Sequence, residues 1–363
     1  MKGSRVPSPA PGAIDCDVHI AVPSTQALVP YLDEYWREHV LTRGLERDNL
    51  DLGAYPPGSP LSGRPDWRPA NGRPGSDLAM LQAHALDGFG IRYAILNCLH
   101  GAQAIFAEDL SAAFCRAIND WVAAEWLDRD ERLRASIVIP AHSAELSVAE
   151  IERRADDRRF VQVLMLVMGE LPPGRRQHWP IYRAAERLGL PVGLHPGSSF
   201  RHAPTSLGWP SYYLEDYVVQ SSACAGALNS LITEGVFVQF PQLKVVLLES
   251  GITWLPNYMW RADKTWRAAR IEVPWNKLPP SEQVRAHVRL TLQPFDAPPT
   301  AEQARRIIDE LGSDNLLLFS TDYPHWHFEG HEAIPDGLPS SLVERMLQRN
   351  PLDTYPRLTQ EAS

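Results

Sequence analysis

Short apolar segments alternate with longer segments whose apolar residues recur at helical spacing. The short segments are rich in Val, Ile and Leu, which is typical of parallel strands that are buried on both faces. Eight strands are predicted in this way: Ala13–Ile20, Tyr93–His100, Leu133–Pro140, Phe160–Val167, Pro191–Pro196, Val245–Gly251, Val288–Phe295 and Leu316–His325. The segments between them predict helices over Ala107–Asp128, Ala144–Asp156, Pro180–Leu188, Tyr212–Glu234 and Thr300–Leu311.

This repeated alternation of strand and helix favours either a closed barrel or an open doubly wound sheet. No GxGxxG motif and no phosphate-binding glycine loop follows any predicted strand, which removes the main reason to choose the open sheet. We therefore predict an α/β fold, a (β/α)8 barrel of the TIM type, formed by residues 13–350. Residues 1–12 are rich in Pro, Ser and Gly and are expected to be a disordered lead, and residues 351–363 a C-terminal tail.

A long insertion separates the first predicted strand from the second. Its segment Tyr55–Ser76 is so dense in Pro and Gly that regular secondary structure is not expected there. The segment is either an inert surface loop or a lid over the mouth of the barrel. We favour the lid, because insertions that follow barrel strands lie on the catalytic face.

Composition and charge limit the size of the core and the partners that are expected. With 363 residues, 44% of them hydrophobic, the chain is long enough to bury a sizeable core. The net charge is −9 and there is no run of Lys and Arg, so neither nucleic acid nor an anionic membrane is an expected partner. No apolar run approaches the ~20 residues that cross a bilayer, and the first residues are not expected to form a signal peptide.

The cysteines favour a reducing compartment, so a cytoplasmic location is expected. Cys16, Cys98, Cys115 and Cys224 are scattered without a CxxC pair, which favours reduced thiols over a disulfide framework. The expected partner is a small-molecule substrate. Association into a homodimer is left open by the sequence.

Candidate chemistry lies where the predicted strands end, because those residues face the reaction chamber of a barrel. The first strand ends in Asp15-Cys16-Asp17-Val18-His19, and alternation places Asp17 and His19 on one face. His195, Glu249 and Asp322 end three further strands. Each of these alone is more often a core residue or a helix cap. Carboxylates and imidazoles that converge on one rim instead indicate a bound cation, so we predict a metal site.

The same motifs resemble the amidohydrolase superfamily: DVH on the first strand, His after the fifth, and STDYPH after the eighth. The resemblance is closer to its second branch, which includes aminocarboxymuconate-semialdehyde decarboxylase and related aromatic-acid decarboxylases. The segments FPQLKVVLLESG, WLPNYMWRAD, LVPYLDEYWREH and GWPSYYLEDY also resemble that branch. The resemblance runs from about Asp15 to about Asn350. It implies a (β/α)8 barrel with a divalent metal held by Asp17, His19, His195 and Asp322.

The chain departs from the family pattern at three places. Many members carry HxH where this chain has Asp17-Val18-His19, and the decarboxylases place a His where it has Glu249. The fourth strand, Phe160–Val167, contains no lysine, which excludes the lysine-bridged two-zinc site of the binuclear hydrolases. One ion, or two ions bridged by Glu249 or Asp17, remain as alternatives. Two are favoured, because the candidate ligands outnumber the needs of one ion.

The ligand types suit Zn, Fe or Mn, since they are carboxylates and imidazoles without a thiolate. His202 and His325 are further candidate ligands, which could equally hydrogen-bond substrate or order a loop. Either Asp322 or Glu249 is expected to move the proton in catalysis. The remaining histidines of predicted helices and turns are interpreted as structural: His39, His84, His142, His178 and His287.

Aromatic side chains near the strand ends predict a roomy apolar pocket for a bulky carbocyclic or aromatic acid. Two arginines are candidates for binding a carboxylate, although surface ion pairing is the alternative for each. The expected substrate-binding residues are Arg201, Trp209, Tyr213, Trp254, Arg261 and Trp326.

Three functions remain open at this point. The preferred one is a metal-dependent hydrolase or non-oxidative decarboxylase, as the resemblance implies. The second is a non-haem iron or diiron oxygenase that hydroxylates a bulky acid or its thioester, because Asp17 and Glu249 make the ligand set richer in carboxylates. The third is a degenerate barrel that only binds, against which the retained ligand types argue.

Overall fold

Eight parallel strands follow one another in chain order around a single sheet. The computed structural model describes residues 11–44, 63–197, 202–325 and 333–359. The sheet closes on itself, because the Cys16 amide donates to the Phe319 carbonyl and Val18 forms a parallel bridge with Tyr323. The predicted (β/α)8 barrel is therefore confirmed. The strands are β1 Ala13–His19, β2 Ile91–Asn97, β3 Leu133–Val138, β4 Phe160–Leu166, β5 Val192–His195, β6 Val245–Leu247, β7 Val288–Thr291 and β8 Leu317–Leu318.

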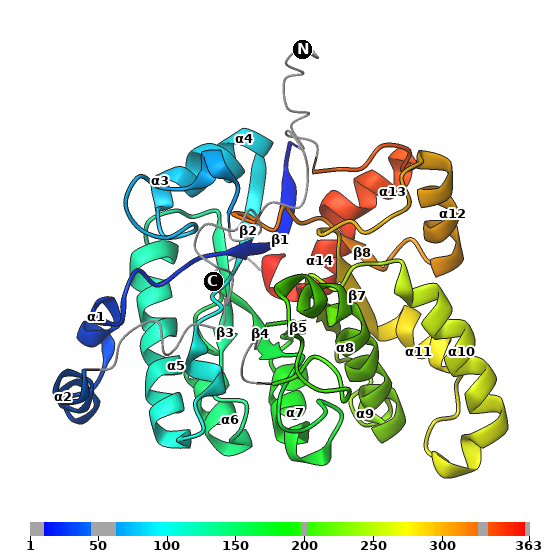
Figure 1. The fold of residues 1–363 in the computed structure, drawn as a ribbon, viewed down its shortest axis with the longest axis horizontal. Coiled ribbons are helices and arrows are strands. Elements are labelled where there is room, and N and C mark those ends of the chain that lie inside the picture. Colours follow the sequence, from blue (N-terminus) through cyan, green and yellow to red (C-terminus); the bar gives the residue numbers. More distant parts are fainter. Residues whose placement is uncertain (1–10, 45–62, 198–201, 326–332, 360–363) are drawn as a thin grey trace.

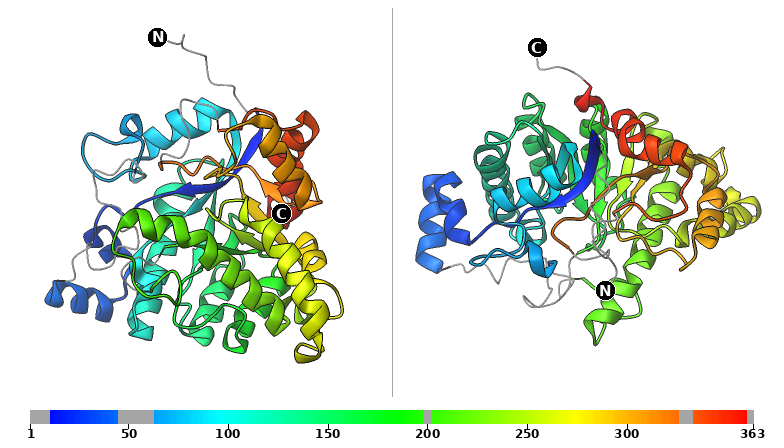
Figure 2. Two further views of the ribbon diagram at one scale, coloured as in Figure 1. Left: turned by 45° about the vertical axis from the view of Figure 1, so that its right-hand side comes forward. Right: turned by 90° about the horizontal axis from the view of Figure 1, so that it is seen from above.

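Helices surround these strands on the outside, as Figures 1 and 2 show. All five predicted helices are present: α5 Glu108–Val122, α6 Ala144–Arg153, α7 Trp179–Arg187, α8 Tyr213–Glu234 and α12 Ala301–Leu311. The described residues also form α1 Thr25–Leu28, α2 Glu34–Arg43, α3 Leu78–Leu81, α4 Asp87–Phe89, α9 Val236–Gln239, α10 Trp254–Ala269, α11 Pro280–His287, α13 Ser340–Glu344 and α14 Asn350–Thr354. Among the described residues, no helix is long and apolar enough to cross a membrane.

The interior of the barrel is unusually polar near its carboxyl end. Asp15, Asn97 and Gln162 are fully buried, and Ser136 is nearly so. They lie on the inward faces of their strands, where branched apolar residues usually fill a barrel. Gly193 of β5 leaves room for this layer, since a Cβ atom there would lie 2.5 Å from the Gln162 amide nitrogen. The barrel core therefore carries a hydrogen-bonded layer directly below its mouth.

The C-terminal residues close the opposite end of the barrel. Residues 351–358, expected as part of a tail, lie in α14 and in the short helix η11 Pro356–Leu358. Tyr355 is fully buried and its hydroxyl donates to Gln162 Oε1 at 3.0 Å. The Arg357 guanidinium donates to the carbonyl of Phe160, the first residue of β4, at 2.9 Å. These residues thus pack against the barrel itself.

The second half of the long insertion is fixed against the mouth. Residues 55–62 of the expected lid lie outside the described residues. In the described part, the ring of Trp67 is buried 5.0 Å from the ring of Tyr323. The Arg64 amide donates to the Pro324 carbonyl at 2.9 Å, and Gly75 accepts from the Ala21 amide at 3.0 Å. This half of the insertion therefore supports the segments that follow β1 and β8.

Candidate functional site

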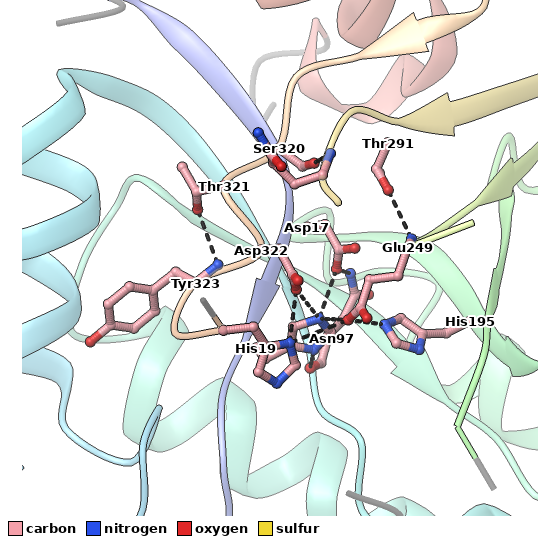
Figure 3. A network of polar contacts seen from close by, with 12 residues as sticks. Asp17, His19, Asn97, His195, Glu249, Thr291, Ser320, Thr321, Asp322 and Tyr323 are labelled. Atoms are coloured by element: carbon pink, nitrogen blue, oxygen red, sulfur yellow. Dashed lines mark hydrogen bonds and ion pairs between the residues drawn. The ribbon is translucent and has the colours of Figure 1, made fainter. Parts of the chain in front are cut away.

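Six acidic and imidazole side chains converge at the carboxyl ends of the strands, and all are buried. In Figure 3 these side chains point toward one another: Asp17, His19, His195, Glu249 and Asp322. They form two overlapping groups that share His19 and Glu249. The members are Asp17 and His19 of β1, His195 at the end of β5, Glu249 after β6, and Asp322 and His325 after β8.

His19 lies at the centre of this cluster. Its Nε2 atom is 2.9 Å from Glu249 Oε1, 3.0 Å from Asp322 Oδ1 and 3.3 Å from Asp17 Oδ1. Its other ring nitrogen is 3.2 Å from the Asn97 carbonyl, which fixes the plane of the ring. A single imidazole nitrogen carries at most one proton, so it cannot satisfy three carboxylates. A cation bound among the carboxylates can neutralise their charge.

The remaining distances have the spacing of ligands around one ion. His195 Nε2 lies 2.9 Å from Glu249 Oε1, and His325 Nδ1 lies 3.0 Å from Asp322 Oδ1 and 3.4 Å from Glu249 Oε1. Ligand atoms bound at about 2.1 Å to one metal lie about 3.0 Å apart in octahedral and about 3.4 Å apart in tetrahedral geometry. The donor set therefore fits a divalent metal.

Burial and mutual charge shift the pKa values of the cluster. Burial raises the pKa of Asp17 to about 6, although His19 and His195 oppose the rise. Burial would also raise the pKa of Glu249, but the nearby imidazoles, His195 first, hold it well below its usual range. Burial lowers the pKa of His325, whereas Asp322 and Glu249 raise it to about 9. Three clustered carboxylates thus demand positive charge, either as protons on imidazoles or as a metal ion.

A buried chain of hydrogen bonds orients Asp17. The Asn97 amide donates to Asp17 Oδ1 at 2.8 Å, and its own oxygen accepts from the Ser136 hydroxyl at 2.6 Å. Gln162 donates to that hydroxyl at 2.9 Å. Asp17 Oδ2 has no hydrogen-bond partner among the described residues, so it is available as a ligand. We did not predict Asn97 or Gln162, because only His, Asp and Glu were sought at strand ends. Gln162 could have been found in the sequence, because it is the one polar residue of the apolar segment FVQVLML.

The backbone leaves the strand conformation at the two carboxylates that follow β6 and β8. Glu249 has a φ of 46° and Asp322 a φ of 57°, the left-handed region that non-glycine residues rarely adopt. Each is held there, since the Glu249 amide donates to Thr291 Oγ1 at 3.0 Å and the Asp322 amide to the Asp17 carbonyl at 3.1 Å. These turns end the strands earlier than predicted and aim both carboxylates at His19.

Below the cluster, Asp15 of β1 forms hydrogen bonds to the segment that follows β8. It is fully buried and accepts from the Thr321 amide at 3.0 Å and from the Thr321 hydroxyl at 2.6 Å. Thr321 immediately precedes Asp322, so this pair of contacts fixes the position of the Asp322 backbone.

The structure does not bring every candidate residue to this cluster. His202 belongs to neither group and lines a separate cavity beside the mouth. Arg261 is exposed on α10 and lines a groove with Asn229 of α8. Trp209 is 57% exposed. Arg201 and Trp326 lie outside the described residues.

Two aromatic residues at the start of α8 do lie near the cluster. Tyr213 and Tyr217 have ring centroids 6.0 Å apart. Burial and then the charge of Glu249 raise the pKa of both hydroxyls, so both stay protonated. Trp254, on the first turn of α10, is half-buried and donates to the Ser250 carbonyl at 2.9 Å. Tyr217 was not predicted, although it follows Tyr213 by one helical turn.

Comparisons with known proteins identify the family of this chain. The profile of a family described as amidohydrolase matches residues 14–357. A gamma-resorcylate decarboxylase from Rhizobium radiobacter is 28% identical over 262 residues, which are 68% of this chain and 77% of the relative.

Solved structures share the fold. A dihydroxybenzoic acid decarboxylase from a Polaromonas species, with bound manganese and the inhibitor 2-nitroresorcinol, has a TM-score of 0.68 at 19% identity and covers 97% of this chain and 99% of its own. A 5-carboxyvanillate decarboxylase from Sphingomonas paucimobilis has a TM-score of 0.68 at 20% identity and covers 95% and 99%.

Proposed function

Because this chain belongs to the amidohydrolase family, we propose that it is a metal-dependent decarboxylase of aromatic carboxylic acids. One observation carries the proposal: buried acidic and imidazole side chains form two overlapping groups of four, and the ligand atoms of each group lie within 4.8 Å of one another. The named relative and the two named structures are decarboxylases of aromatic acids, which supports carboxylate loss over hydrolysis.

The metal is best held by Asp17, His19, His195 and Glu249, the first of the two groups. Because the second group shares His19 and Glu249 with the first, we now favour one ion over the two favoured from the sequence. Manganese is supported by its presence in the Polaromonas structure, and zinc or iron would suit the same ligand types. A divalent ion bound there would supply positive charge that binds the oxygen atoms of an acid.

Asp322 is positioned to move the proton. Loss of carbon dioxide from an aromatic acid requires a proton at the ring carbon that bears the carboxylate. The carbon–carbon bond then breaks, its electron pair returns to the ring, and carbon dioxide leaves. Asp322 Oδ1 is 3.0 Å from His325 Nδ1, so the pair can hold a proton next to the ligands and pass it to the ring. Tyr213, Tyr217 and Trp254 would flank the ring of the substrate.

The other two functions have less support. None of the named relatives is an oxygenase. A barrel that only binds would not need two strained backbone turns that aim Glu249 and Asp322 at His19.

Cytoplasmic location is supported by four buried cysteines that form no disulfide.

The test is direct. The protein loaded with Mn²⁺ is mixed with 2,6-dihydroxybenzoate and related hydroxybenzoates, and carbon dioxide and the phenolic product are measured. We expect equal amounts of both, without oxygen consumption, and a loss of at least about 100-fold in kcat for Asp322→Asn with metal content unchanged. Hydrolysis of amides or esters without any release of carbon dioxide would overturn the proposal of decarboxylation. Oxygen uptake coupled to product formation would support the oxygenase instead.

A further inference from the structure

The turn that carries Glu249 is held in place from β7 and from the loop that follows it. Glu249 has a φ of 46° and Gly251 a φ of 66°, so both lie in the left-handed region. This conformation is costly for a glutamate and persists only where surrounding contacts fix it. One such contact, visible in Figure 3, is the bond from the Glu249 amide to Thr291 Oγ1, at the end of β7, at 3.0 Å. Further contacts come from Asp296, in the loop after β7.

Asp296 accepts hydrogen bonds from both residues that follow Gly251. Its Oδ1 atom accepts from the Ile252 amide at 2.8 Å and from the Thr253 amide at 3.3 Å. Its Oδ2 atom accepts from the Thr253 hydroxyl at 2.8 Å. An ionised carboxylate only accepts, and its two oxygen atoms have enough lone pairs to hold all of these donors at once. The end of the turn is therefore fixed by one side chain.

Gly251 shows how closely this carboxylate lies against the turn. A Cβ atom at this position would lie 2.4 Å from Asp296 Oδ2, a distance that real Cβ atoms essentially never show. The positive φ of Gly251 also favours glycine over any other residue. The residue two positions after Glu249 is thus matched both to the turn and to the aspartate that packs on it.

The start of α10 is adapted to the same contact. Thr253 is the N-cap residue of α10, and an N-cap threonine usually accepts a hydrogen bond from an amide of its own helix. The Thr253 side chain makes no such bond, and its hydroxyl donates to Asp296 instead. Thr253 therefore joins the turn to the loop after β7 rather than capping the helix.

We infer that Asp296 is a positioning residue for Glu249. Thr291 fixes the amide of Glu249 and Asp296 fixes the residues that follow it, so its carboxylate is aimed at His19, with Oε1 2.9 Å from Nε2. Asp296 is exposed and belongs to neither group of the cluster, so it acts through the turn alone. This inference deepens the proposed function and rests on it in one respect, the assignment of Glu249 as a metal ligand.

Mn²⁺ affinity is the readout that separates positioning from stabilisation of α10. Protein stripped of metal is dialysed against Mn²⁺ without substrate, and bound metal is measured by elemental analysis. Asp296→Ala removes the acceptors of the turn, whereas Asp296→Asn keeps an oxygen atom for the two amides and an amide group that can donate to the Thr253 hydroxyl.

Asp33→Ala is the matched control. Asp33 is also exposed and also accepts from a backbone amide at the start of a helix, that of Trp36 in α2, at 3.0 Å. Figure 1 shows α2 and α10 on opposite sides of the barrel. Both alanine variants should lower the melting temperature slightly, because each loses a contact at the beginning of a helix.

Only Asp296→Ala should change metal binding. We expect its Mn²⁺ affinity to be about 10-fold weaker, as for other residues that orient ligands, and the affinities of Asp296→Asn and Asp33→Ala to stay within about 2-fold of the native value. Native affinity in Asp296→Ala would overturn the inference. Equal weakening in Asp33→Ala would also overturn it, because the loss would then follow from general destabilisation.

Thr253→Val tests the same contact if Asp296→Ala does not fold. It keeps the shape of the side chain and removes the hydroxyl that donates to Asp296, and Thr253→Ser restores that hydroxyl. Weaker Mn²⁺ binding in Thr253→Val that Thr253→Ser restores would support the inference, and native binding in Thr253→Val would overturn it.

Release of carbon dioxide is measured separately, so the two proposals fail independently. The expected pattern of Mn²⁺ affinities without any decarboxylation would overturn the proposed function and support the role of Asp296. Decarboxylation together with native Mn²⁺ affinity in Asp296→Ala would give the opposite result.

Discussion

Glu249 is the residue on which the number of metal ions depends. It lies within 3.4 Å of three imidazole nitrogens, those of His19, His195 and His325. As a ligand of one ion, Glu249→Gln should lower metal affinity at least about 10-fold and remove turnover, because a neutral amide binds a cation more weakly. If Glu249 bridges two ions, the same change should halve the metal content. Elemental analysis decides between these outcomes.

Glu170→Gln is the control for this measurement, because Glu170 is an exposed glutamate outside the cluster. It should keep full metal and full turnover. Full metal together with full turnover in Glu249→Gln would contradict both roles of Glu249.

Asn97 is a positioning residue for the proposed ligand Asp17. Asn97→Leu keeps the shape but removes the hydrogen bond to Asp17 Oδ1. We expect metal affinity about 10–100-fold weaker, as for other residues that orient ligands. Because Asn97 does not touch the metal, excess Mn²⁺ should restore kcat. Titration of activity against metal concentration tests this, and a kcat that stays low at saturating metal would mean that Asn97 acts on the reaction itself.

At the scale of elements, the insertion after β1 supports the segment that carries Asp322. Trp67 packs against Tyr323, with the Arg64 guanidinium 4.5 Å above its ring. Trp67→Ala should lower the free energy of unfolding by about 3–5 kcal/mol, the usual cost of removing a buried Trp, and should weaken metal binding too. Urea unfolding and metal titration measure both effects. Trp260→Ala, at an exposed site, should change neither. Normal metal affinity in Trp67→Ala would restrict the insertion to a structural role.

An ion pair just before β3, between Asp130 and Arg132, has an effect on stability that depends on pH. The hydrogen bond from Arg132 holds the pKa of Asp130 down at about 2, below its ordinary value of 3.8. A lowered folded-state pKa stabilises the protein above the unfolded value, and this stabilisation disappears as the pH falls through about 2. Asp130→Asn should therefore be less stable than the native protein at pH 7, with a difference that shrinks between about pH 4 and pH 2. Melting temperatures across this range test the sign. A difference independent of pH would assign the effect to the lost hydrogen-bond geometry alone.

At the scale of the whole molecule, the C-terminal residues and the metal cluster are linked through the barrel interior. Tyr355 bonds to Gln162, Gln162 to Ser136, and Ser136 to Asn97. Tyr355→Phe should cost about 1 kcal/mol of unfolding free energy for one lost hydrogen bond, and Tyr355→Ala about 3–5 kcal/mol for the cavity. Equal costs, measured by urea unfolding, would mean that packing around the ring is unimportant.

Removal of the metal should destabilise the whole barrel as well. A ligand that binds only the folded state stabilises it by about 2.7 kcal/mol at 100 times its Kd, and the buried carboxylates repel one another without a cation. The melting temperature should fall on chelation and recover with Mn²⁺.

The sequence by itself determined the order of strands and helices and the main members of the cluster. Burial on both faces leaves a local signature in β1 to β8, and the alternation of side chains along a strand is enough to place Asp17 and His19 on one face. His195, Glu249 and Asp322 were found because each ends an apolar strand.

Only the tertiary structure decided which side chains meet. The bond from Asn97 to Asp17 depends on the register of β1 with β2, and the chain from Tyr355 to Gln162 spans 193 positions. His202 lies in the loop after β5 and Arg261 within helix α10, and each lines a cavity other than the cluster. Periodicity reports burial residue by residue, whereas these contacts follow from barrel closure and from the left-handed turns at Glu249 and Asp322, which no local pattern encodes.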